Sequence, residues 1–546
     1  MAGYVFTIII VFLVLVLLLS GIMHDIAHRK AVYERIRSTF GSSSDSSFDT
    51  KVFDRLPAMY TYMTGKDPDD FTLDDITESD LSLRDIFARM NRCATNAGEE
   101  YMYCRFRTFS PEPFKLYDEI TKYADDSESA VDLLYILETY IGKHDYDGFA
   151  VIQSMQGAKR QSVVSDIVSL ILLVISVVLI AASPVIGITA TVIMVCVSVW
   201  GYFRGRRSMD ENLKGFALAQ RLIRCSQKLS QSGCDNFAQY KELTGILRGG
   251  FLISGKDQTS SSPVSIILDY VRMITHIDII VFKLKISRLI GHIDLLESLY
   301  IDTGRLDCIL AVSSYIRERR YCRAVISDDK IIKASQIYHP LVPKPVYNDF
   351  RAGRGVLITG SNASGKSTFL KAVAVNVLFA RSFGFAFADA FETGKFKIYT
   401  SMALADNLLG SESYYVVEAR SIKRMCDIAA SDCLFIIDEV LKGTNTVERI
   451  AAGANILKYL CDRSAMCFAA THDLELTYLL EDRMDLYHFT EEISEDTVTF
   501  PFIITPGVSD RTNAIRLLAM LGFDATIVSG ADELVGQYNT TGNWIR

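Results

Sequence analysis

The sequence predicts an α/β domain on the C-terminal side of the chain, preceded by an all-α region that a pair of uncharged helices interrupts. Three observations lead to this fold class. From residue 351 to about 500, short apolar runs of β type alternate with helical stretches, which is typical of an α/β sheet. Residues 24–160 and 208–330 instead carry apolar residues at helical spacing. Three long segments without charged residues complete the pattern.

Length and composition limit the number of domains and the class of partner. A chain of 546 residues exceeds what one hydrophobic core holds, so we expect two or three domains. Hydrophobic residues make up 49% of the chain, and the excess is concentrated in the three uncharged segments. The formal charge of −8 gives no overall basic surface, which argues against nucleic-acid binding but leaves a local basic patch open. The 11 cysteines show neither CxxC pairs nor zinc spacing, so we expect a reducing compartment.

The first uncharged segment runs from Tyr4 to Ile22 and is long enough to cross a hydrocarbon core at about 1.5 Å per residue. No basic residue precedes it and no small-residue cleavage site follows. A membrane anchor is therefore favoured, and a cleaved signal peptide is the alternative. By the positive-inside rule, the residues after this helix face the cytoplasm because basic residues follow it, namely Arg29, Lys30, Arg35 and Arg37.

The second and third uncharged segments, 167–182 and 185–203, are separated only by Ser183 and Pro184, which predicts a transmembrane hairpin. Basic residues at both ends place both ends in the cytoplasm; they are Lys159, Arg160, Arg204, Arg206 and Arg207. The alternative is a buried helical hairpin in a soluble core. Three spans with so little charge inside them favour an anchor over a transport pathway. We therefore expect a multi-pass protein of the cell membrane with three spans.

A glycine-rich loop indicates the chemistry of the C-terminal side. The stretch GVLITGSNASGKST fits the phosphate-binding pattern G-x-x-x-x-G-K-[ST]. It follows a strand-like run over 356–359 and precedes an amphipathic helical stretch over 368–380, which is the context that the pattern requires. The backbone N–H groups at the helix start would point at the phosphates, Lys366 would neutralise phosphate oxygens, and the Ser367 hydroxyl would bind Mg²⁺. The residues expected around the phosphates are Gly360, Ser361, Asn362, Ala363, Ser364, Gly365, Lys366, Ser367 and Thr368.

Two further strand-like runs end in residues that suit nucleotide hydrolysis. CLFIIDEV ends in Asp438, expected to hold Mg²⁺ through water, and Glu439, expected to polarise the attacking water. MCFAATHDLEL carries His472, expected to sense the γ-phosphate. The alternatives are an acidic pair at a strand end and a histidine without a role in catalysis. Asn407 is a weaker candidate for contacting Mg²⁺ or the water, and the adjacent Asp406 fits a helix cap equally well.

The order of these motifs resembles the ATPase domain of the MutS mismatch-repair family, a branch of the ABC ATPase class. GSNASGKST is similar to the family's GPNMGGKST, SYYVVE at 413–418 to STFMVE, and DEVLKGTNT to DEIGRGTST. The resemblance implies that Ser413 reaches the γ-phosphate in the partner's site and that Gly443 and Thr444 cross the dimer interface. IYHP at 337–340 resembles the family's His-Pro element, which implies that His339 lies near the adenine.

The resemblance extends to the helical regions, with two departures. RLDCILAVSSYIRERRYCRAVIS and IFARMNRCATNAGEEYMYCRF, the latter with Thr95 and Gly98, are similar to the family's helical core, and 506–523 resembles its C-terminal helical element. The family's N-terminal mismatch-reading domain has no counterpart. The uncharged hairpin also falls inside the helical core, near the position of the family's DNA clamp. The resemblance therefore implies a membrane-anchored variant that lacks the mismatch-reading domain.

Seven segments are expected from these observations. They are a transmembrane anchor (1–23), a linker (24–66), the first part of the helical core (67–160), a transmembrane hairpin (161–207), the second part of the core with its lever (208–336), a MutS-like ATPase domain of P-loop type (337–500) and a C-terminal helical dimerisation element (501–546).

The resemblance implies a Mg²⁺-dependent ATPase that converts ATP and water to ADP and phosphate and works as a nucleotide-gated dimer on the cytoplasmic face of the membrane. The expected cofactors are ATP and Mg²⁺. The expected partners are a second copy bound through the ATPase domain, the lipid bilayer, double-stranded DNA and an unidentified protein. Two alternatives are a nucleotide-switched membrane scaffold with no DNA role and a transporter ATPase. The absence of an LSGGQ-type signature argues against the transporter.

Overall fold

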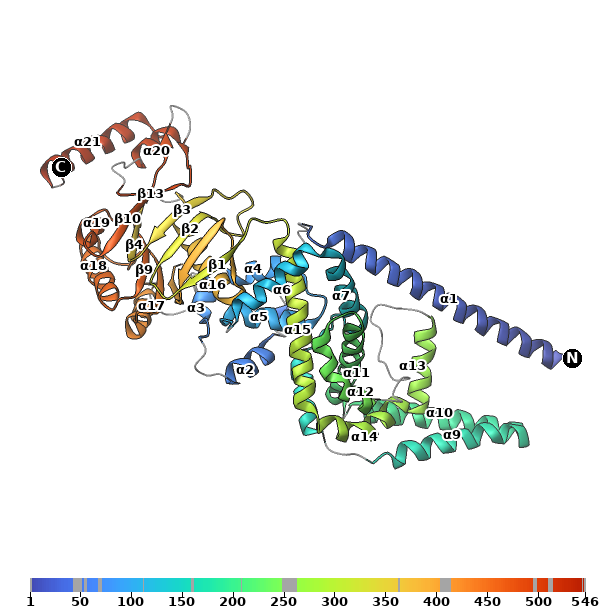
Figure 1. Cartoon of the computed structure of the whole chain (residues 1–546). Helices are drawn as coiled ribbons and strands as arrows, with labels where there is room; N and C mark the ends of the chain where they lie inside the picture. The colour runs from blue at the N-terminus through green and yellow to red at the C-terminus, as the bar shows by residue number, and fades with distance from the viewer. Residues whose placement is uncertain are drawn as a thin grey trace. The chain divides into compact units, whose positions relative to one another are not determined.

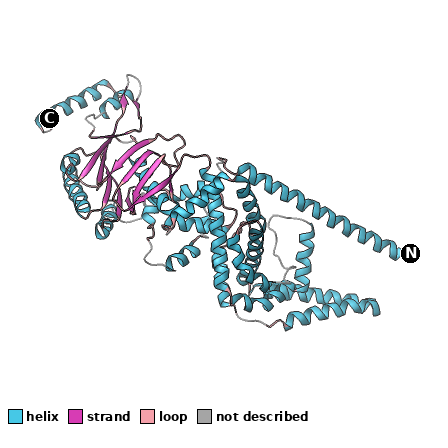
Figure 2. Cartoon of the chain, in the orientation of Figure 1, coloured by secondary structure: helices cyan, strands magenta, loops and turns pink. Residues whose placement is uncertain are grey.

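The fold is taken from a computed structural model that divides into two compact units (Figure 1). It describes residues 2–42, 52–53, 56–66, 71–110, 112–158, 162–207, 209–247, 263–361, 364–402, 414–493, 498–508, 514–542 and 544. The first unit comprises Met1–Pro68, Arg89–Cys104 and Glu119–Glu318, and the second comprises Asp69–Ala88, Arg105–Asp118 and Arg319–Arg546. Figure 2 shows that the described strands all belong to the C-terminal part, as the expected order of an all-α and an α/β region requires.

The first unit is helical over its described residues. Its helices are α1 (Ala2–Thr39), α2 (Pro57–Lys66), α7 (Ser127–Tyr140), α8 (Gly148–Ser154), α9 (Val164–Ala182), α10 (Pro184–Arg207), α11 (Asp210–Gln231), α12 (Lys241–Leu247), α13 (Pro263–Thr275), α14 (Ile277–Ile290) and α15 (Ile293–Ile316), with 3₁₀ turns η2 (Met155–Gly157) and η3 (Asp235–Tyr240). Helices α4 (Leu83–Met90), α5 (Asn96–Arg107) and α6 (Pro113–Asp125) have residues in both units.

Helix α15 is the buried centre of the first unit. Every residue from 306 to 316 is buried, and most of these residues are apolar, as expected for a helix that is surrounded on all sides. Its buried polar groups are bonded, as burial requires: Ser313 Oγ donates to the carbonyl oxygen of Ile120 at 2.8 Å, and Asp307 accepts from the start of α5. Helix α5 crosses α15 closely, because a Cβ at Gly304 would lie 2.4 Å from the carbonyl oxygen of Ala97.

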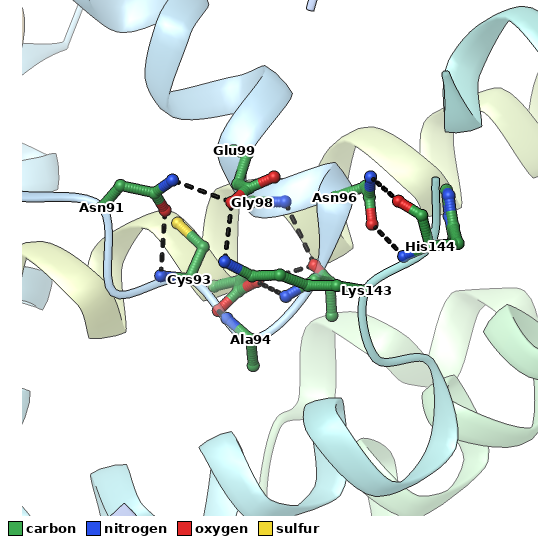
Figure 3. Close-up of polar contacts among 10 residues, drawn as sticks. Asn91, Cys93, Ala94, Asn96, Gly98, Glu99, Lys143 and His144 are labelled. Atoms are coloured by element: carbon green, nitrogen blue, oxygen red, sulfur yellow. Dashed lines mark hydrogen bonds and ion pairs between the residues drawn. The ribbon is translucent and has the colours of Figure 1, made fainter. Parts of the chain in front are cut away.

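The start of α5 is held by a polar network (Figure 3). Asp307 accepts from the backbone N–H of Ala94 at 2.9 Å, from that of Thr95 at 2.8 Å and from Thr95 Oγ1 at 2.6 Å. Burial raises the pKa of Asp307 to about 6, although these hydrogen bonds act in the opposite direction. A Cβ at Gly98 would lie 2.3 Å from Asp307 Oδ2. Thr95 and Gly98, predicted as part of one element, therefore meet at a single carboxylate.

Helices α9 and α10 form an antiparallel hairpin in which apolar side chains face outward and polar side chains face inward. This is the reverse of the usual arrangement in a soluble protein. Small polar residues lie between the helices, where Ser169 and Ser198 are 3.2 Å apart and Thr191 donates to Ser176 at 3.2 Å. The outward faces carry exposed valine and isoleucine, including Val174, Ile175, Val178, Val192 and Ile193.

Among the described residues, two helices, α9 and α10, are long and apolar enough to cross a membrane. The third expected span, residues 4–22, lies within α1, but most of its side chains are outside the described residues. The expectation of three spans is therefore not supported, and the structure supports at most a hairpin.

The second unit contains two sheets and a small hairpin. The six-stranded sheet has the order β13 (Ile504–Pro506), β10 (Met484–Phe489), β4 (Gly355–Thr359), β9 (Met466–Ala470), β8 (Cys433–Asp438) and β7 (Lys397–Ser401). All its strands are parallel except β13. The five-stranded sheet has the order β3 (Asn348–Ala352), β2 (Ile332–Ile337), β6 (Ala390–Gly394), β1 (Cys322–Ser327) and β5 (Phe385–Ala386), and β11 (Glu492–Ile493) pairs with β12 (Val498–Thr499).

Helices cover the six-stranded sheet on both faces. α17 (Tyr414–Ile428), α18 (Thr446–Asp462) and α19 (Glu475–Leu480) contribute buried residues to one apolar cluster with β8 and β9. α16 (Lys366–Phe383) contacts β8 and β9 as well as β1 and β5 of the other sheet, and most of its residues are buried. The remaining helices of this unit are α3 (Asp75–Asp80), α20 (Ala514–Met520) and α21 (Ala525–Thr541). Because β4, β8 and β9 are parallel, their carboxyl ends meet at one edge of the sheet, where ligands bind in such folds.

Candidate functional site

The loop between β4 and α16 needs glycine at both ends. Gly360 has φ +143° and Gly365 has φ +105°, values that other residues rarely adopt. There is also no space for a side chain, because a Cβ would lie 2.9 Å from the carbonyl oxygen of Phe489 at Gly360 and 3.0 Å from the ring of Phe502 at Gly365. The expected strand and helix are therefore present as β4 and α16, with the two glycines at the described ends of the segment between them.

The loop carries polar groups that lack partners within the described part of the chain. The hydroxyl of Ser364 is fully buried, and neither it nor the Ser361 hydroxyl has a hydrogen-bond partner there. Among the described residues, no side chain caps the start of α16, although the first N–H groups of a helix have no partner inside the helix. These unfilled donors match a ligand with several acceptor oxygens, such as a phosphate chain.

Lys366 is buried and folds back onto the loop. Its Nζ donates to the carbonyl oxygens of Gly360 and Ser361, each at 2.7 Å. Burial lowers the pKa of Lys366, while the carboxylates of Glu439 and Asp438 act in the opposite direction. The ammonium group therefore lies beside the loop and within the field of two carboxylates.

Asp438 is the last residue of β8 and lies beside the start of α16. Ser367 Oγ donates to Asp438 Oδ2 at 2.6 Å. The two residues predicted to bind Mg²⁺ are 71 positions apart in sequence and in direct contact in the structure. A hydroxyl and a carboxylate are oxygen ligands of the type that Mg²⁺ prefers.

Glu439 adopts a left-handed backbone conformation with φ +62°, and Leu441 follows with φ +60°. The Glu439 N–H donates to the carbonyl oxygen of Ala470 at 2.9 Å, which ties the turn to the end of β9. The Glu439 carboxylate lies 3.4 Å from His472 Nδ1 and 3.5 Å from Lys442 Nζ. Left-handed conformations of non-glycine residues store strain and cluster at functional sites.

His472 follows β9, and its side chain is half exposed. Its Nε2 lies 3.7 Å from Asp473 Oδ1, while its Nδ1 lies near Glu439. Thr471 continues the sheet, because its N–H donates to the carbonyl oxygen of Ile358 at 2.9 Å. The structure thus brings His472, Glu439, Asp438 and the loop lysine to one edge of the sheet.

The other predicted residues lie elsewhere or outside the described residues. Thr368 is exposed on the first turn of α16. His339 is buried and accepts from the N–H of Leu341 through Nδ1 at 3.2 Å, and its Nε2 has no hydrogen-bond partner within the described part of the chain. Burial lowers the pKa of His339 to about 4, with Lys371 as a second cause. Asn362, Ala363, Asp406, Asn407 and Ser413 lie outside the described residues.

Sequence reasoning missed an aromatic group at the loop. Phe489 and Phe502 both approach the glycines, and Phe502 has φ +56°. Asn348 holds this segment, since its Nδ2 donates to the carbonyl oxygen of Phe502 at 3.0 Å and its Oδ1 accepts from the N–H of Ile504 at 2.8 Å. The stretch FPF at 500–502 was the available signal, but an aromatic pair in an irregular segment does not by itself indicate a site.

The fold and the site together define the class of this domain. The chain has a mostly helical N-terminal region and an α/β C-terminal region, in which a glycine-rich loop, a lysine, two carboxylates and a histidine meet at the carboxyl ends of parallel strands. This arrangement is that of an α/β domain with a ligand site at its sheet edge.

Known proteins resemble the C-terminal part of this chain. Residues 356–539 match the family model for MutS domain V. The DNA mismatch repair protein MutS of Halothermothrix orenii is 31% identical over 254 residues, which are 44% of this chain and 28% of that protein. The proteins of the same name from Protochlamydia amoebophila and Fusobacterium nucleatum are 28% and 27% identical, over 44% and 48% of this chain and 30% and 31% of their own lengths. The C-terminal part of the chain is therefore similar to MutS proteins, as the sequence motifs predict, although the chain spans less than a third of the length of these relatives.

Proposed function

We propose that the α/β domain binds ATP with Mg²⁺ and hydrolyses ATP to ADP and phosphate. The observation that carries the proposal is the contact between Ser367 and Asp438 at 2.6 Å, next to Glu439 and the loop lysine. It joins a helix-start hydroxyl to a strand-end carboxylate, the pair that holds Mg²⁺ in phosphoryl-transfer sites of this type. The MutS domain V match over 356–539 supports the same reading.

Each residue has a role that follows from its position. Lys366 would exchange its bonds to two loop carbonyls for bonds to phosphate oxygens, and the donors of the loop would complete the cradle. Ser367 and Asp438 would hold Mg²⁺, which supplies positive charge for the transfer. Glu439 would orient the attacking water and accept its proton, with His472 holding the carboxylate in place. Phe502, whose ring packs on Gly365, is a candidate surface for the nucleotide base.

We further propose that two copies of the chain meet across this site. Large apolar side chains are exposed around it, in particular Val447 and Tyr478, which are 77% and 78% exposed. Tyr415, Val416 and Leu474 are exposed as well. Tyr415 and Val416 lie at the start of α17, Val447 at the start of α18 and Tyr478 in α19, and Leu474 precedes α19 directly. Large exposed apolar side chains of this kind are typical of interaction sites, and a second copy of the chain would cover them. The expected roles of Ser413, Gly443 and Thr444 across the interface depend on this arrangement.

The α9–α10 hairpin supports membrane attachment. Valine and isoleucine face outward while serine and threonine face inward, and a Cβ at Gly187 would lie 2.3 Å from the backbone nitrogen of Ile180. Small residues between closely packed helices and apolar residues outside are the arrangement of helices in lipid. We propose that the hairpin enters the cell membrane and that the ATPase domain is cytoplasmic.

Two candidate functions differ in the process that the ATPase would serve. The relatives are named DNA mismatch repair proteins, which favours DNA as a partner, but the chain spans less than a third of their length. The hairpin inside the helical unit favours instead a nucleotide-switched membrane scaffold that acts on another protein. Adding double-stranded DNA to an ATP hydrolysis assay separates the two, because only a DNA-dependent ATPase changes its rate.

Two substitutions test the nucleotide site in the full chain purified in detergent. Lys366→Ala should weaken ATP binding roughly 10- to 100-fold, because each hydrogen bond to a charged group is worth about 1.5–3 kcal/mol. Glu439→Gln should bind ATP as the parent does, because Glu439 acts on the water. Titration with a fluorescent ATP analogue measures both affinities. Equal affinities for the parent and Lys366→Ala would rule out the assigned site.

A further inference from the structure

A series of polar and charged side chains links the start of α18 to the candidate catalytic carboxylate. Arg449 Nε and Nη2 donate to the two carboxylate oxygens of Asp473, at 2.9 Å and 2.7 Å. Asp473 Oδ1 lies 3.7 Å from His472 Nε2, and His472 Nδ1 lies 3.4 Å from Glu439 Oε1. Lys442 is the last member of this series, and its Nζ lies 3.5 Å from Glu439 Oε2.

The Arg449–Asp473 pair is more buried and better oriented than the other contacts in this series. The two side chains are only 15% and 8% exposed, and the pairing is bidentate, which fixes both direction and distance. Asp473 is also anchored through its backbone, because its N–H donates to Thr471 Oγ1 at 3.0 Å. By contrast, His472 is half exposed and has no tighter contact with a described residue than the two carboxylates on either side.

Arg449 also ties this group to another element. It lies in the first turn of α18, whose start is capped by Asn445, since Asn445 Oδ1 accepts from the N–H of Val447 at 2.9 Å. The segment just before, with Gly443 and Thr444, is the one that the dimer proposal places at the interface. The pair therefore fixes the histidine after β9 relative to the beginning of α18.

We propose that Arg449 and Asp473 are positioning residues for ATP hydrolysis, which hold the His472 ring against Glu439 and set it relative to the start of α18. The proposal rests on the proposed function and deepens it. Without Arg449, the buried Asp473 carboxylate would have the His472 ring as its nearest hydrogen-bond donor and would draw the ring away from Glu439. Glu439 would then lose one of the two contacts that aim it at the water.

The variants Arg449→Gln and Asp473→Asn test the proposal in the full chain in detergent, by steady-state ATP hydrolysis. We expect kcat to fall about tenfold or more, because small displacements of a catalytic group can cost up to about 100-fold in rate. KM for ATP should stay within about twofold, since the affected groups act on the transition state and not on the bound nucleotide. Arg449→Lys should recover part of the rate, because it keeps the charge and loses the bidentate geometry.

A matched control is Arg354→Gln. Arg354 pairs with Asp485 at 2.7 Å in the same sheet, but at the amino end of β4, away from the site. It should leave kcat unchanged. Combining Arg449→Gln with Asp473→Asn should cost little more than either change alone, because both remove the same contact. Circular dichroism of each variant gives the folded fraction against which its rate is normalised.

Four results would overturn the proposal: an unchanged normalised kcat in Arg449→Gln and Asp473→Asn, a rise in KM alone, an equal fall in the Arg354→Gln control, or fully additive losses in the double variant. Its failure can be told apart from failure of the proposed function. If the parent hydrolyses ATP and Glu439→Gln does not, the site stands and only the positioning role fails. If Glu439→Gln hydrolyses ATP like the parent, the proposed function fails and the positioning role with it.

Discussion

At the scale of single residues, the turn after β8 has a backbone conformation that the conformational preferences of its own residues do not explain. Glu439 and Leu441 both have positive φ, and a single such residue costs of the order of 1–3 kcal/mol. The turn is held from outside, because the Glu439 N–H bonds to Ala470 and the Ser367 hydroxyl bonds to Asp438. The fold therefore supports a strained turn at the position where the proposed reaction needs a carboxylate.

His339 gives a prediction about pH. Burial lowers its pKa from 6.5 to about 4, so in the folded protein it stays neutral while in the unfolded chain it takes up a proton as the pH falls below 6.5. Its contribution to stability is thus fully present above pH 6.5 and is lost as the pH falls through about 4. His339→Gln should flatten this dependence. Urea unfolding at about pH 7 and about pH 5, on either side of the ordinary histidine pKa, measures it.

The control for this prediction is His488→Gln, at a half-buried histidine on β10 whose Nδ1 lies 3.1 Å from the carbonyl oxygen of Gly507. His488→Gln should change the urea midpoint of unfolding. Unlike His339→Gln, it should not reduce the loss of stability between about pH 7 and about pH 5. An identical loss of stability in the parent and His339→Gln between the two pH values would contradict the assignment.

The sequence predicts the site residues that follow from local patterns. The spacing of glycine, lysine and serine, with a strand before and a helix after, indicates the loop, and Asp438 ends an apolar run that is indeed β8. Phe502 and the Arg449–Asp473 pair could not be predicted, because their contacts join residues far apart in sequence through irregular segments or helix ends. Only the folded chain brings these groups together.

At the scale of elements, the crossing of α5 and α15 depends on a missing side chain. Gly98→Ala would place a Cβ 2.3 Å from Asp307 Oδ2, in contact with the carboxylate that holds the start of α5. We expect a loss of about 1–3 kcal/mol, the usual cost of overpacking. Thermal unfolding followed by circular dichroism measures it. Gly157→Ala is the control, since a Cβ there would meet nothing within 4 Å, and equal melting temperatures for all three proteins would contradict the prediction.

The hairpin allows a test that depends on its environment. Val178, on the outer face of α9, is 66% exposed, so Val178→Asp should be harmless in water. In a bilayer it should cost about 2.5–3.5 kcal/mol and reduce the share of the protein recovered with membranes. Fractionation of cells expressing each variant measures this share. Val325→Asp, at a position on β1 that is 56% exposed, is the control. A membrane-bound share unaffected by Val178→Asp would show that α9 does not lie in lipid.

The helices themselves follow closely from the sequence. The uncharged segments 167–182 and 185–203 correspond to α9 and α10, which extend slightly beyond them. An uncharged run is enough to predict such a helix, because apolar side chains can be buried or face lipid without a specific partner residue. Which of their faces meet depends on Ser169, Thr191 and Gly187, and this pairing could not be predicted from hydrophobicity alone.

The boundary of the α/β unit is a property of the whole molecule, and local patterns do not indicate it. The unit includes 69–88 and 105–118 as well as the chain from 319 onward. The reason is visible at the end of β7, where Asp80 accepts from Thr400 Oγ1 at 2.7 Å and from the N–H of Met402 at 3.0 Å. These partners are 320 and 322 positions apart in sequence. Helical spacing around Asp80 predicts a helix there but cannot say which domain it joins.

The central claim is that the full chain is a Mg²⁺-dependent ATPase whose reaction uses Glu439. The most direct measurement is the rate of phosphate release from ATP by the parent and by Glu439→Gln, each purified in detergent, with and without double-stranded DNA. We predict hydrolysis by the parent that requires Mg²⁺ and falls at least about 100-fold in Glu439→Gln, as expected when a group that takes the proton is lost. A rate in Glu439→Gln equal to that of the parent would contradict the account, whatever the effect of DNA.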